Sequence, residues 1–396
     1  MTGTADETPT NAHGYADPAR FSIAAGGHNL TFYPGGPERL ESLIALIDGA
    51  QTSLGVFYYI FDKDRSGRLV RDALVGAARR GVRVDVIVDA FGNDAGADFF
   101  APLIAAGGSF AVFSPRWGTR YLVRNHQKFV IADNARVMTG GANVQDAYFA
   151  SVRDDGWCDL AVLIEGAVAA RFADWFALVQ AWVANSAHGR TRGLRRLRDL
   201  VRDWDGGQGP VRLLVGGPLV RRGHWAWVFR QDLQKATRLD TVSPYFSPPR
   251  SFRRLFRRIG RRGTARMIMA GKSDIGAAID MARLLYGKLL RARVKIFEFA
   301  PAKLHLKLLV VDDVSYVGSA NLDKRSFRIN VELMVRIEDA GLAARLREMI
   351  DHLEQASVPI TPAWYARQST FFNKLRWRLA YWASLADYRI SKAGTV

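Results

Sequence analysis

Cysteine is nearly absent from this chain of 396 residues, which contains only Cys158. A single cysteine excludes an intramolecular disulfide and fits a reducing compartment. Long apolar runs are also missing, since no stretch reaches the roughly 18 uninterrupted apolar residues of a membrane-spanning helix. Residues 1–20 are polar and lack the basic start and apolar core of a signal peptide. These absences predict a protein that is soluble or peripheral to a membrane.

Acidic residues are scarce relative to basic ones. The chain has 38 Asp and Glu against 56 Lys and Arg, which gives a formal net charge of +18. Residues 186–262 hold 19 basic and 5 acidic residues, so 19 − 5 = +14 of this charge lies in one stretch. Such a local excess favours an anionic partner: nucleic acid, anionic lipid or a phosphorylated substrate. The alternative is a solvated basic surface that only aids solubility.

The order of expected strands and helices repeats between the two halves. Short β-branched and aromatic runs predict strands, and apolar positions at helical spacing predict helices. The expected strands lie at 53–60, 82–89, 110–113 and 159–165, and again at 238–246, 265–270, 294–297 and 330–335. Helices are expected at 38–48, 66–80 and 168–182. The repeat and the chain length predict an α/β fold of two tandem units, each a mixed β-sheet flanked by helices.

Changes in composition set the expected boundaries. We expect a disordered leader at 1–20, a first unit at 21–185 and a basic linker at 186–207. A second unit follows at 208–356, and a basic amphipathic tail occupies 357–396. Apolar and basic residues alternate at helical spacing in this tail. Such a helix either docks on the protein's own surface or lies on lipid.

Two short stretches, one in each half, carry the strongest signal in the sequence. Each reads His-x-Lys, four mostly apolar residues and Asp, followed by a Gly-Gly or Gly-Ser turn and Asn. The members are His126, Lys128, Asp133 and Asn143, and His305, Lys307, Asp312 and Asn321. The interval from His to Asn is 143 − 126 = 17 in the first copy and 321 − 305 = 16 in the second. Matching offsets in two copies predict one duplicated functional site.

These residue types suit the cleavage of a phosphodiester. One imidazole can attack phosphorus and form a covalent intermediate, while a second gives its proton to the departing oxygen. On a strand, residues i and i+2 share a face, so we expect each histidine and its lysine to project together into a site between the two units. Lysine and asparagine side chains can then hold the phosphoryl oxygens. The scheme needs no metal or other cofactor, and the sequence has no cluster with metal-ligand spacing.

The duplicated His-x-Lys-x4-Asp pattern resembles that of the phospholipase D superfamily over roughly residues 30–356. Within it, Gly318-Ser319-Ala320-Asn321 and Asn330-Val331-Glu332 are similar to bacterial cardiolipin synthases, in particular to members without N-terminal membrane helices. The resemblance implies two units packed about a pseudo-twofold axis. It also implies phosphatidyl transfer through a phosphohistidine, with an anionic phospholipid as substrate and a membrane surface as partner.

The resemblance also implies roles for individual residues. His126 would be the nucleophile and His305 the general acid, although the symmetric motif does not decide which histidine attacks. Asp133 and Asp312 belong to the catalytic motif but stand at strand ends, where a structural role is expected. In this family an acidic residue downstream of each motif orients the histidine of that motif, and Asp159 and Glu332 occupy these positions. Lys128, Lys307, Asn143 and Asn321 would hold the phosphoryl oxygens.

We therefore expect a phosphatidyltransferase of cardiolipin synthase type, bound peripherally to the cytoplasmic face of the cell membrane. The alternatives are a phospholipase D hydrolase, a nuclease of the same superfamily, or a non-catalytic protein that binds lipid or nucleic acid. Nucleic acid suits the basic stretch, but duplex binding does not require the Trp- and Phe-containing tail. His224, in a Gly/aromatic loop, is a further candidate to reach the site. The sequence leaves the oligomeric state open.

Overall fold

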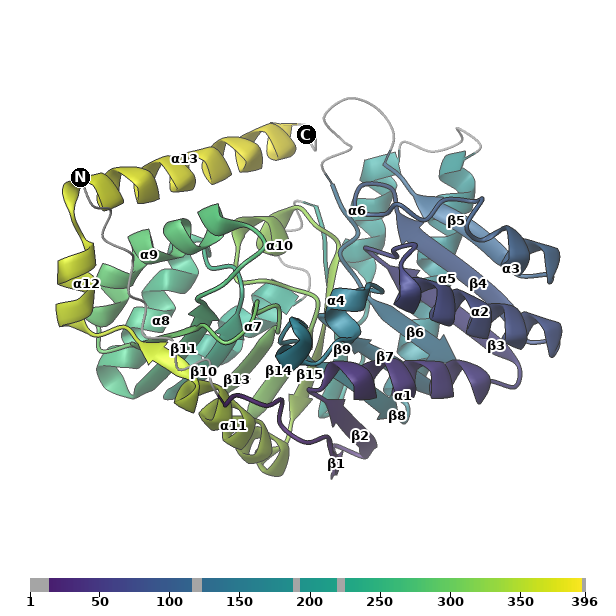
Figure 1. The fold of residues 1–396 in the computed structure, drawn as a ribbon, viewed down its shortest axis with the longest axis horizontal. Helices are drawn as coiled ribbons and strands as arrows, with labels where there is room; N and C mark the ends of the chain where they lie inside the picture. The colour runs from purple at the N-terminus through teal and green to yellow at the C-terminus, as the bar shows by residue number, and fades with distance from the viewer. Residues whose placement is uncertain (1–13, 116–122, 188–192, 219–224, 394–396) are drawn as a thin grey trace.

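The computed structural model describes residues 14–115, 123–187, 193–218 and 225–393. The chain forms two eight-stranded mixed sheets, one in each half, which are flanked by helices and lie beside each other (Figure 1). His224 and parts of the expected leader and linker lie outside the described residues.

The first sheet has the strand order β1-β2-β8-β7-β6-β3-β4-β5. Strands β3, β4 and β5 are parallel, and the other neighbours are antiparallel. The strand bounds are β1 Phe21–Ala25, β2 His28–Tyr33, β3 Ser53–Tyr58, β4 Arg83–Asp89, β5 Ser109–Phe113, β6 Phe129–Ala132, β7 Arg136–Gly140 and β8 Ala161–Glu165.

The second sheet has the order β16-β12-β11-β10-β13-β14-β15-β9. Its parallel strands are β10, β11 and β12. The bounds are β9 Val211–Gly216, β10 Arg238–Ser243, β11 Thr264–Ala270, β12 Lys295–Phe299, β13 Leu308–Val311, β14 Val314–Gly318, β15 Glu332–Glu338 and β16 Ser357–Pro359. Read from β12 to β9, this sheet repeats the order of the first from β5 to β2. The expected fold of two tandem mixed-sheet units is therefore confirmed.

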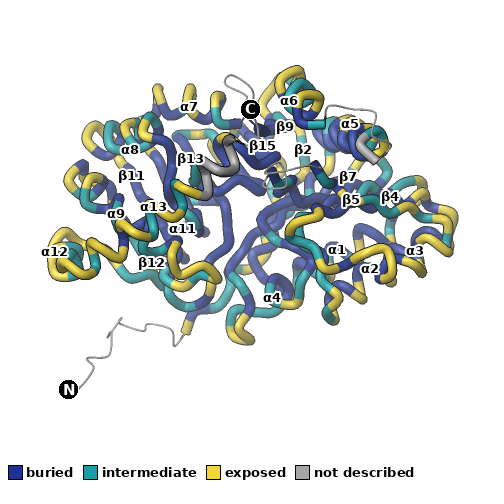
Figure 2. The backbone as a smooth tube through the Cα atoms, turned by 90° about the horizontal axis from the view of Figure 1, so that it is seen from above, coloured by how far each residue is buried: buried dark blue, intermediate teal, exposed yellow. Residues whose placement is uncertain are grey.

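Helices cover the outer faces of the sheets, where exposed residues alternate with buried ones (Figure 2). Helix α2 illustrates why they form. Asp64 caps its first turn by accepting a hydrogen bond from Gly67 N at 2.9 Å, and Gly81 follows its end with a φ of +89°. The bounds are α1 Gly36–Asp48, α2 Arg65–Arg79, α3 Ala101–Ala105, α4 Asp146–Phe149, α5 Val168–Ala187, α6 Gly193–Asp203, α7 Trp225–Lys235, α8 Arg250–Arg262, α9 Gly276–Leu290, α10 Lys324–Arg328, α11 Ala340–Gln355, α12 Pro362–Gln368 and α13 Phe371–Ala393.

Backbone hydrogen bonds join the two units at two equivalent places. The segment before β6 pairs with the start of β15, where His126 N donates to Val331 O at 2.8 Å. The segment before β13 pairs with the start of β8, where His305 N donates to Cys158 O at 2.8 Å. One apolar core contains residues of both sheets, including Phe129 and Leu333. The interface therefore passes directly through the two motif segments.

Two expected boundaries are wrong at their edges. The leader was expected to be disordered up to residue 20, but Tyr15 is buried against the rings of Phe299 and His352. The second unit was expected to end at 356, but β16 pairs antiparallel with β12 and extends the sheet into the expected tail. The local composition is polar in both places. Contacts with the second unit nevertheless order these residues, through the buried ring of Tyr15 in one place and through strand pairing in the other.

Candidate active site

The first motif enters the site from the segment that joins β5 to β6. His126 is 8% exposed, and its backbone is fixed by the bond to Val331 described above. The preceding residue, Asn125, donates its backbone N–H to Oδ2 of buried Asp89 at 2.7 Å. The second motif occupies the equivalent place before β13, where His305 is 5% exposed. Both histidines therefore stand on backbone that is anchored to the other unit.

Each histidine is held by a carboxylate of the other unit. Nδ1 of His126 lies 3.1 Å from Oε2 of Glu332, and Nδ1 of His305 lies 2.7 Å from Oδ2 of Asp159. Both carboxylates are fully buried. The expectation that each acid orients the histidine of its own motif is wrong, because the residue before each acid pairs with the opposite motif segment across the interface. A carboxylate on Nδ1 leaves Nε2 as the nitrogen available for chemistry.

The two motif lysines lie behind the histidines and are almost completely buried. Nζ of Lys128 donates to His126 O at 2.5 Å and lies 5.2 Å from the ring centre of Tyr59. Nζ of Lys307 lies 2.8 Å from Nδ1 of His305 and also donates to His305 O. The expected proximity of each lysine to its histidine is present. Both amino groups therefore lie behind the wall of the site, and burial lowers the pKa of Lys128 well below its usual value.

Burial and the lysines keep both histidines neutral. Desolvation, reinforced mainly by Lys128 for His126 and by Lys307 for His305, lowers both imidazole pKa values to about 4. Burial acts to raise the pKa of Asp159, but His305 and Lys307 outweigh it and bring this pKa to about 2. Burial also lowers the pKa of Lys307, to about 8. At neutral pH the site thus combines two carboxylates with two neutral imidazoles and a protonated Lys307.

Two asparagines and the turns before them complete the site. Asn143 and Asn321 are 1% and 4% exposed and line the same cavity as the histidines. The amide of Asn143 donates to the hydroxyl of Tyr148 at 3.0 Å, while Oδ1 of Asn321 is buried and unpaired. Gly141 has no room for a side chain, because a Cβ there would lie 2.2 Å from Oδ1 of Asp159. The glycine therefore allows the carboxylate its close approach.

Asp133 and Asp312 are not brought into this group. Oδ1 of Asp133 accepts hydrogen bonds from the backbone of Thr52 at 2.7 Å and from its hydroxyl at 2.8 Å. Asp312 contacts Thr237 and Arg238 in the same way. Both aspartates have a positive φ, +54° and +46°, in the turns that end β6 and β13. Their contacts fasten these turns to the start of β3 and β10.

A cavity of about 490 Å³ opens onto both histidines. The first unit contributes Tyr59, Arg124, His126, Asn143 and Tyr148. The second unit contributes Tyr245, Asp274, Met281, His305, Asn321, Asp323, Lys324, Arg325 and Asn330, and α13 adds Ala380, Ala383 and Ser384. The sequence-predicted residues His126, Asn143, His305 and Asn321 therefore share one chamber between the units.

Three further residues support the site. They belong to neither motif, so the sequence pattern does not identify them as site residues. The hydroxyl of Tyr148 lies 3.4 Å from Nε2 of His305, and burial raises its pKa well above the usual value. The ring of Tyr59 packs edge-on to His126 at 4.9 Å. The buried guanidinium of Arg39 donates to the backbone oxygens of Tyr148 and Asp159. Arg39 thereby fixes two of the residues that contact His305.

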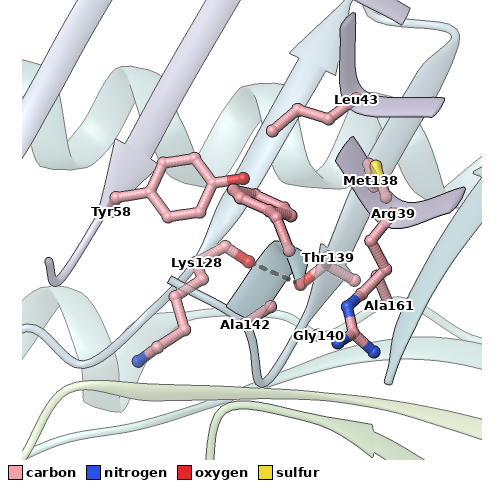
Figure 3. Close-up of a pocket in the computed structure, with 10 residues that line it drawn as sticks. Arg39, Leu43, Tyr58, Lys128, Met138, Thr139, Gly140, Ala142 and Ala161 are labelled. Carbon is pink, nitrogen blue, oxygen red and sulfur yellow. Dashed lines mark hydrogen bonds between the residues drawn. The ribbon is translucent and has the colours of Figure 1, made fainter. Parts of the chain in front are cut away.

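A second, smaller cavity of about 20 Å³ lies between α1 and the first sheet, with room for one water molecule. Arg39, Tyr58 and Lys128 are among the residues that line it (Figure 3). The hydroxyl of Thr139 donates to Lys128 O at 2.8 Å, while the amino end of Lys128 points away from Leu43 and Met138 (Figure 3). Within the described residues, no group of three or more His, Cys, Asp or Glu is arranged to hold a metal ion.

Comparison with known proteins agrees with this geometry. Residues 43–179 and 229–354 match the family described as "Cardiolipin synthase, PLD-like domain". The chain belongs to this family. It is 31% identical to cardiolipin synthase A of Pseudomonas entomophila over 325 residues, which cover 80% of this chain and 66% of that protein. It therefore spans about two thirds of the length of this relative. It is also 28% identical to cardiolipin synthase B of Shigella flexneri, over 90% of this chain and 87% of that protein.

The fold of this PLD-like protein also recurs among solved structures. The phosphatidylserine synthase of Haemophilus influenzae superposes with a TM-score of 0.74 at 16% identity, covering 94% of this chain and 96% of that one. The polyphosphate kinase of Porphyromonas gingivalis superposes with a TM-score of 0.53 at 12% identity, covering 85% of this chain and 49% of that one. These likenesses show a shared fold. In the described part of the chain no helix has the length and apolar character needed to span a membrane.

Proposed function

We propose that this protein is a phosphatidyltransferase that forms cardiolipin from phosphatidylglycerol and a second phospholipid. The observation that carries the proposal is the pair of buried histidines in one cavity, each with a carboxylate on Nδ1 and a lysine behind it. Similarity to cardiolipin synthases A and B supports a phosphatidyl donor. A nuclease or a hydrolase would use the same two histidines. A nuclease would cleave a nucleic acid in place of the phospholipid donor, and a hydrolase would use water as the acceptor.

The proposed reaction has two displacements at one phosphorus atom. Nε2 of neutral His126 attacks the phosphorus, the bond from phosphorus to the glycerol oxygen breaks, and His305 gives its proton to that oxygen. The acceptor hydroxyl then loses its proton to His305 and attacks the phosphohistidine, which frees His126. We assign the acid to His305 because its carboxylate contact is the shorter, 2.7 Å against 3.1 Å. A bound phosphoryl anion raises the pKa of His305 and allows it to carry the proton.

The lysines and asparagines have electrostatic roles in this scheme. The amino groups of the lysines lie behind the histidines, with Lys307 protonated at neutral pH, and the amide groups of Asn143 and Asn321 face the cavity. Positive charge and amide donors at fixed positions stabilise the negative charge that builds up on the phosphoryl oxygens. The chemistry described requires no metal or cofactor.

We also propose that the protein acts at the surface of an anionic membrane, on its cytoplasmic side. Helix α13 supports this placement, because it has two different faces. Since an α-helix advances about 100° per residue, its exposed apolar side chains fall on one side, at Phe371, Phe372, Leu375, Leu379 and Trp382. The opposite side packs on the second unit, with Trp377 buried and Arg376 paired with Asp280 at 2.9 Å. The tail thus docks on the protein and still presents an apolar stripe beside exposed Lys374 and Arg378.

The test is lipid product analysis after the protein is incubated with phosphatidylglycerol vesicles, alongside His126→Ala and His305→Ala. Cardiolipin from the wild type and none from either variant is the expected result. Phosphatidic acid as the only product would mean that water is the acceptor and the protein a hydrolase. Cleavage of DNA with no lipid turnover would move the protein to the nucleases.

A further inference from the structure

Asp89 is a buried carboxylate that the proposed reaction does not use. It ends β4 and is 1% exposed. Oδ2 accepts the backbone N–H of Asn125 at 2.7 Å, and Oδ1 accepts that of Phe91 at 2.8 Å. A carboxylate that is removed from water needs partners for its charge, and backbone N–H groups supply them here to both oxygens. Asp89 therefore joins the end of β4 to the segment that carries His126.

Two routes lead from the carboxylate of Asp89 to His126. The first is the backbone of the residue that precedes the histidine. The second passes through three side chains. The guanidinium of Arg124 lies 3.7 Å from the ring centre of Phe91 and donates to the hydroxyl of Tyr59 at 3.3 Å. The ring of Tyr59 then packs edge-on to that of His126 at 4.9 Å. One carboxylate thus holds both the backbone of His126 and the ring beside it.

The corresponding place in the second unit lacks this carboxylate. Strand β11 corresponds to β4, and it ends at Ala270, which has no polar side chain. Leu304 precedes His305, and its backbone N–H donates to the backbone oxygen of Lys272 at 3.4 Å. This is a long, neutral hydrogen bond, whereas a short bond to a carboxylate is about twice as strong. The segment of His126 is therefore the more firmly held of the two.

We propose that Asp89 is a positioning residue for the histidine that attacks phosphorus. The inference rests on the proposed function, in which His126 is the nucleophile. An attacking nitrogen must meet phosphorus at a set distance and angle, and a small displacement of such a group lowers the rate strongly. Asp89 holds the His126 segment without lining the cavity itself. Loss of its charge should therefore lower kcat and leave KM unchanged.

The charge of Asp89 gives this role a pH dependence. Burial raises its pKa to about 6, although its backbone hydrogen bonds and the charge of Arg124 act against burial. Lys128 and Tyr59 interact with the same carboxylate. As the pH falls through about 6, Asp89 takes up a proton and becomes an uncharged side chain with the shape of asparagine. The advantage of the wild type over Asp89→Asn should shrink in this window.

The experiment compares Asp89→Asn with Asp85→Asn, a matched change on the same strand. The carboxylate of Asp85 contacts Ser109 and Arg83. Phe91→Leu is a second variant, which keeps the backbone N–H but removes the ring on which the guanidinium stacks. Phe91 is 47% exposed, so this variant should fold.

Two soluble substrates are used. One is short-chain phosphatidylglycerol, and the other is bis(para-nitrophenyl) phosphate, a phosphodiester whose leaving group needs no proton from the enzyme. Attack by His126 is common to both substrates, so the second reports on the nucleophile without the acid. The constants kcat and KM are measured above and below pH 6, and urea unfolding checks the fold of each variant.

The expected result is a loss in kcat that depends on pH. At neutral pH, Asp89→Asn should lower kcat by about tenfold or more on both substrates, with KM within about twofold. The ratio of kcat/KM in the wild type to that in Asp89→Asn should fall toward one as the pH drops through about 6. Phe91→Leu should lower kcat by about two- to fivefold. Asp85→Asn should keep both constants.

Other results overturn the inference or the proposed function separately. Equal kcat values in Asp89→Asn and the wild type would overturn the inference. A loss that is the same on both sides of pH 6, or that Asp85→Asn shares, would mean a general weakening of the sheet and would also overturn it. If Asp89→Asn does not fold, an unchanged kcat in Phe91→Leu decides against the positioning role. Turnover of the nitrophenyl ester without turnover of phosphatidylglycerol would overturn the proposed function, and the ester then decides the inference by the same comparison. No cleavage of either substrate by the wild type would overturn both.

Discussion

Oδ2 of Asp159 in the first unit lies 2.7 Å from Nδ1 of His305 in the second. The reverse contact joins Glu332 of the second unit to His126 of the first. Neither unit alone contains a histidine together with the carboxylate that holds it. The duplication therefore produces the site, because each half supplies what the other half lacks.

The first prediction concerns this crossed pairing. Asp159→Asn keeps the shape of the side chain but removes the charge that favours protonated His305, so kcat should fall by about a hundredfold or more. The matched control is Asp155→Asn, at an exposed turn residue whose φ of +59° suits asparagine. Steady-state kinetics with phosphatidylglycerol measure both variants. Equal kcat values in the two would remove Asp159 from the catalytic scheme.

The second prediction separates the aspartates of the motif from the reaction. Asp312→Ala removes the acceptor of several hydrogen bonds from Thr237 and Arg238, and it places a Cβ-bearing residue without a polar side chain at a φ of +46°. We expect a loss of about 1–3 kcal/mol in the free energy of unfolding with little change in kcat. Asp313→Ala, at the exposed neighbour, should change stability by less than about 0.5 kcal/mol. Urea unfolding and kinetics together test it, and a large fall in kcat at unchanged stability would contradict the structural role.

Much of this arrangement could be predicted from the sequence. The two copies of the motif identify His126 and His305, and the repeated order of strands predicts two sheets with equivalent neighbours. The crossed carboxylates could not be assigned, because spacing along the chain does not say which unit Asp159 faces. The burial of Lys128 and Lys307 could not be predicted from the alternation of side chains along a strand either. Both lysines precede β6 and β13, in segments that pair with the other unit.

The β1–β2 hairpin and α13 each have a sequence pattern that indicates their structure only in part. Gly26 and Gly27, with φ values of +57° and +79°, form the two-residue turn of the β1–β2 hairpin. A Gly-Gly pair between alternating residues is a hairpin signal, and here it follows directly on a polar leader. For α13 the apolar periodicity was visible, yet both the docked and the exposed reading fit it. The contacts of Trp377 and Arg376 show that one face docks on the second unit, while Leu379 and Trp382 on another face are exposed.

The third prediction follows from the low pKa values of the histidines. Both imidazoles have a pKa of about 4 when folded and about 6.5 when unfolded. Between these values the unfolded chain binds more protons, so stability rises with pH from 4 to 6.5 and is lost as the pH falls through this window. His126→Gln or His305→Gln should each reduce this slope by up to about 1.4 kcal/mol per pH unit. Urea unfolding at several pH values measures it, and an unchanged slope in both variants would contradict the neutral state.

The fourth prediction concerns the alkaline side of the pH profile. Lys307 has a pKa of about 8, so above this pH its ammonium loses the charge that helps to hold the phosphoryl group. We expect kcat/KM of the wild type to fall as the pH rises through about 8, because this ratio reports groups of the free enzyme. Lys307→Arg keeps a positive charge at every pH tested, so its lower kcat/KM should stay flat through the same range. The same alkaline decline in both proteins would assign it to another group.

The last prediction tests the exposed face of α13. Leu379→Glu/Trp382→Glu replaces two side chains that are 61% and 58% exposed, so the fold and the docked side at Trp377 should be retained. Burying each of these side chains in a bilayer is worth about 1.5–3 kcal/mol, and the added negative charges are repelled by anionic lipid. Binding to phosphatidylglycerol vesicles should therefore fall by a hundredfold or more, measured by sedimentation.

The matched control is Leu69→Glu/Ile104→Glu, which alters two exposed side chains on α2 and α3, at the end of the first unit away from α13 (Figure 1). This variant should bind vesicles as the wild type does. Turnover of a short-chain, soluble phosphatidylglycerol should be equal in all three proteins, because the cavity and its histidines are untouched. If the α13 variant binds vesicles normally, the apolar stripe serves something other than lipid. If it also loses activity on the soluble substrate, α13 shapes the cavity, and the membrane assignment loses its support.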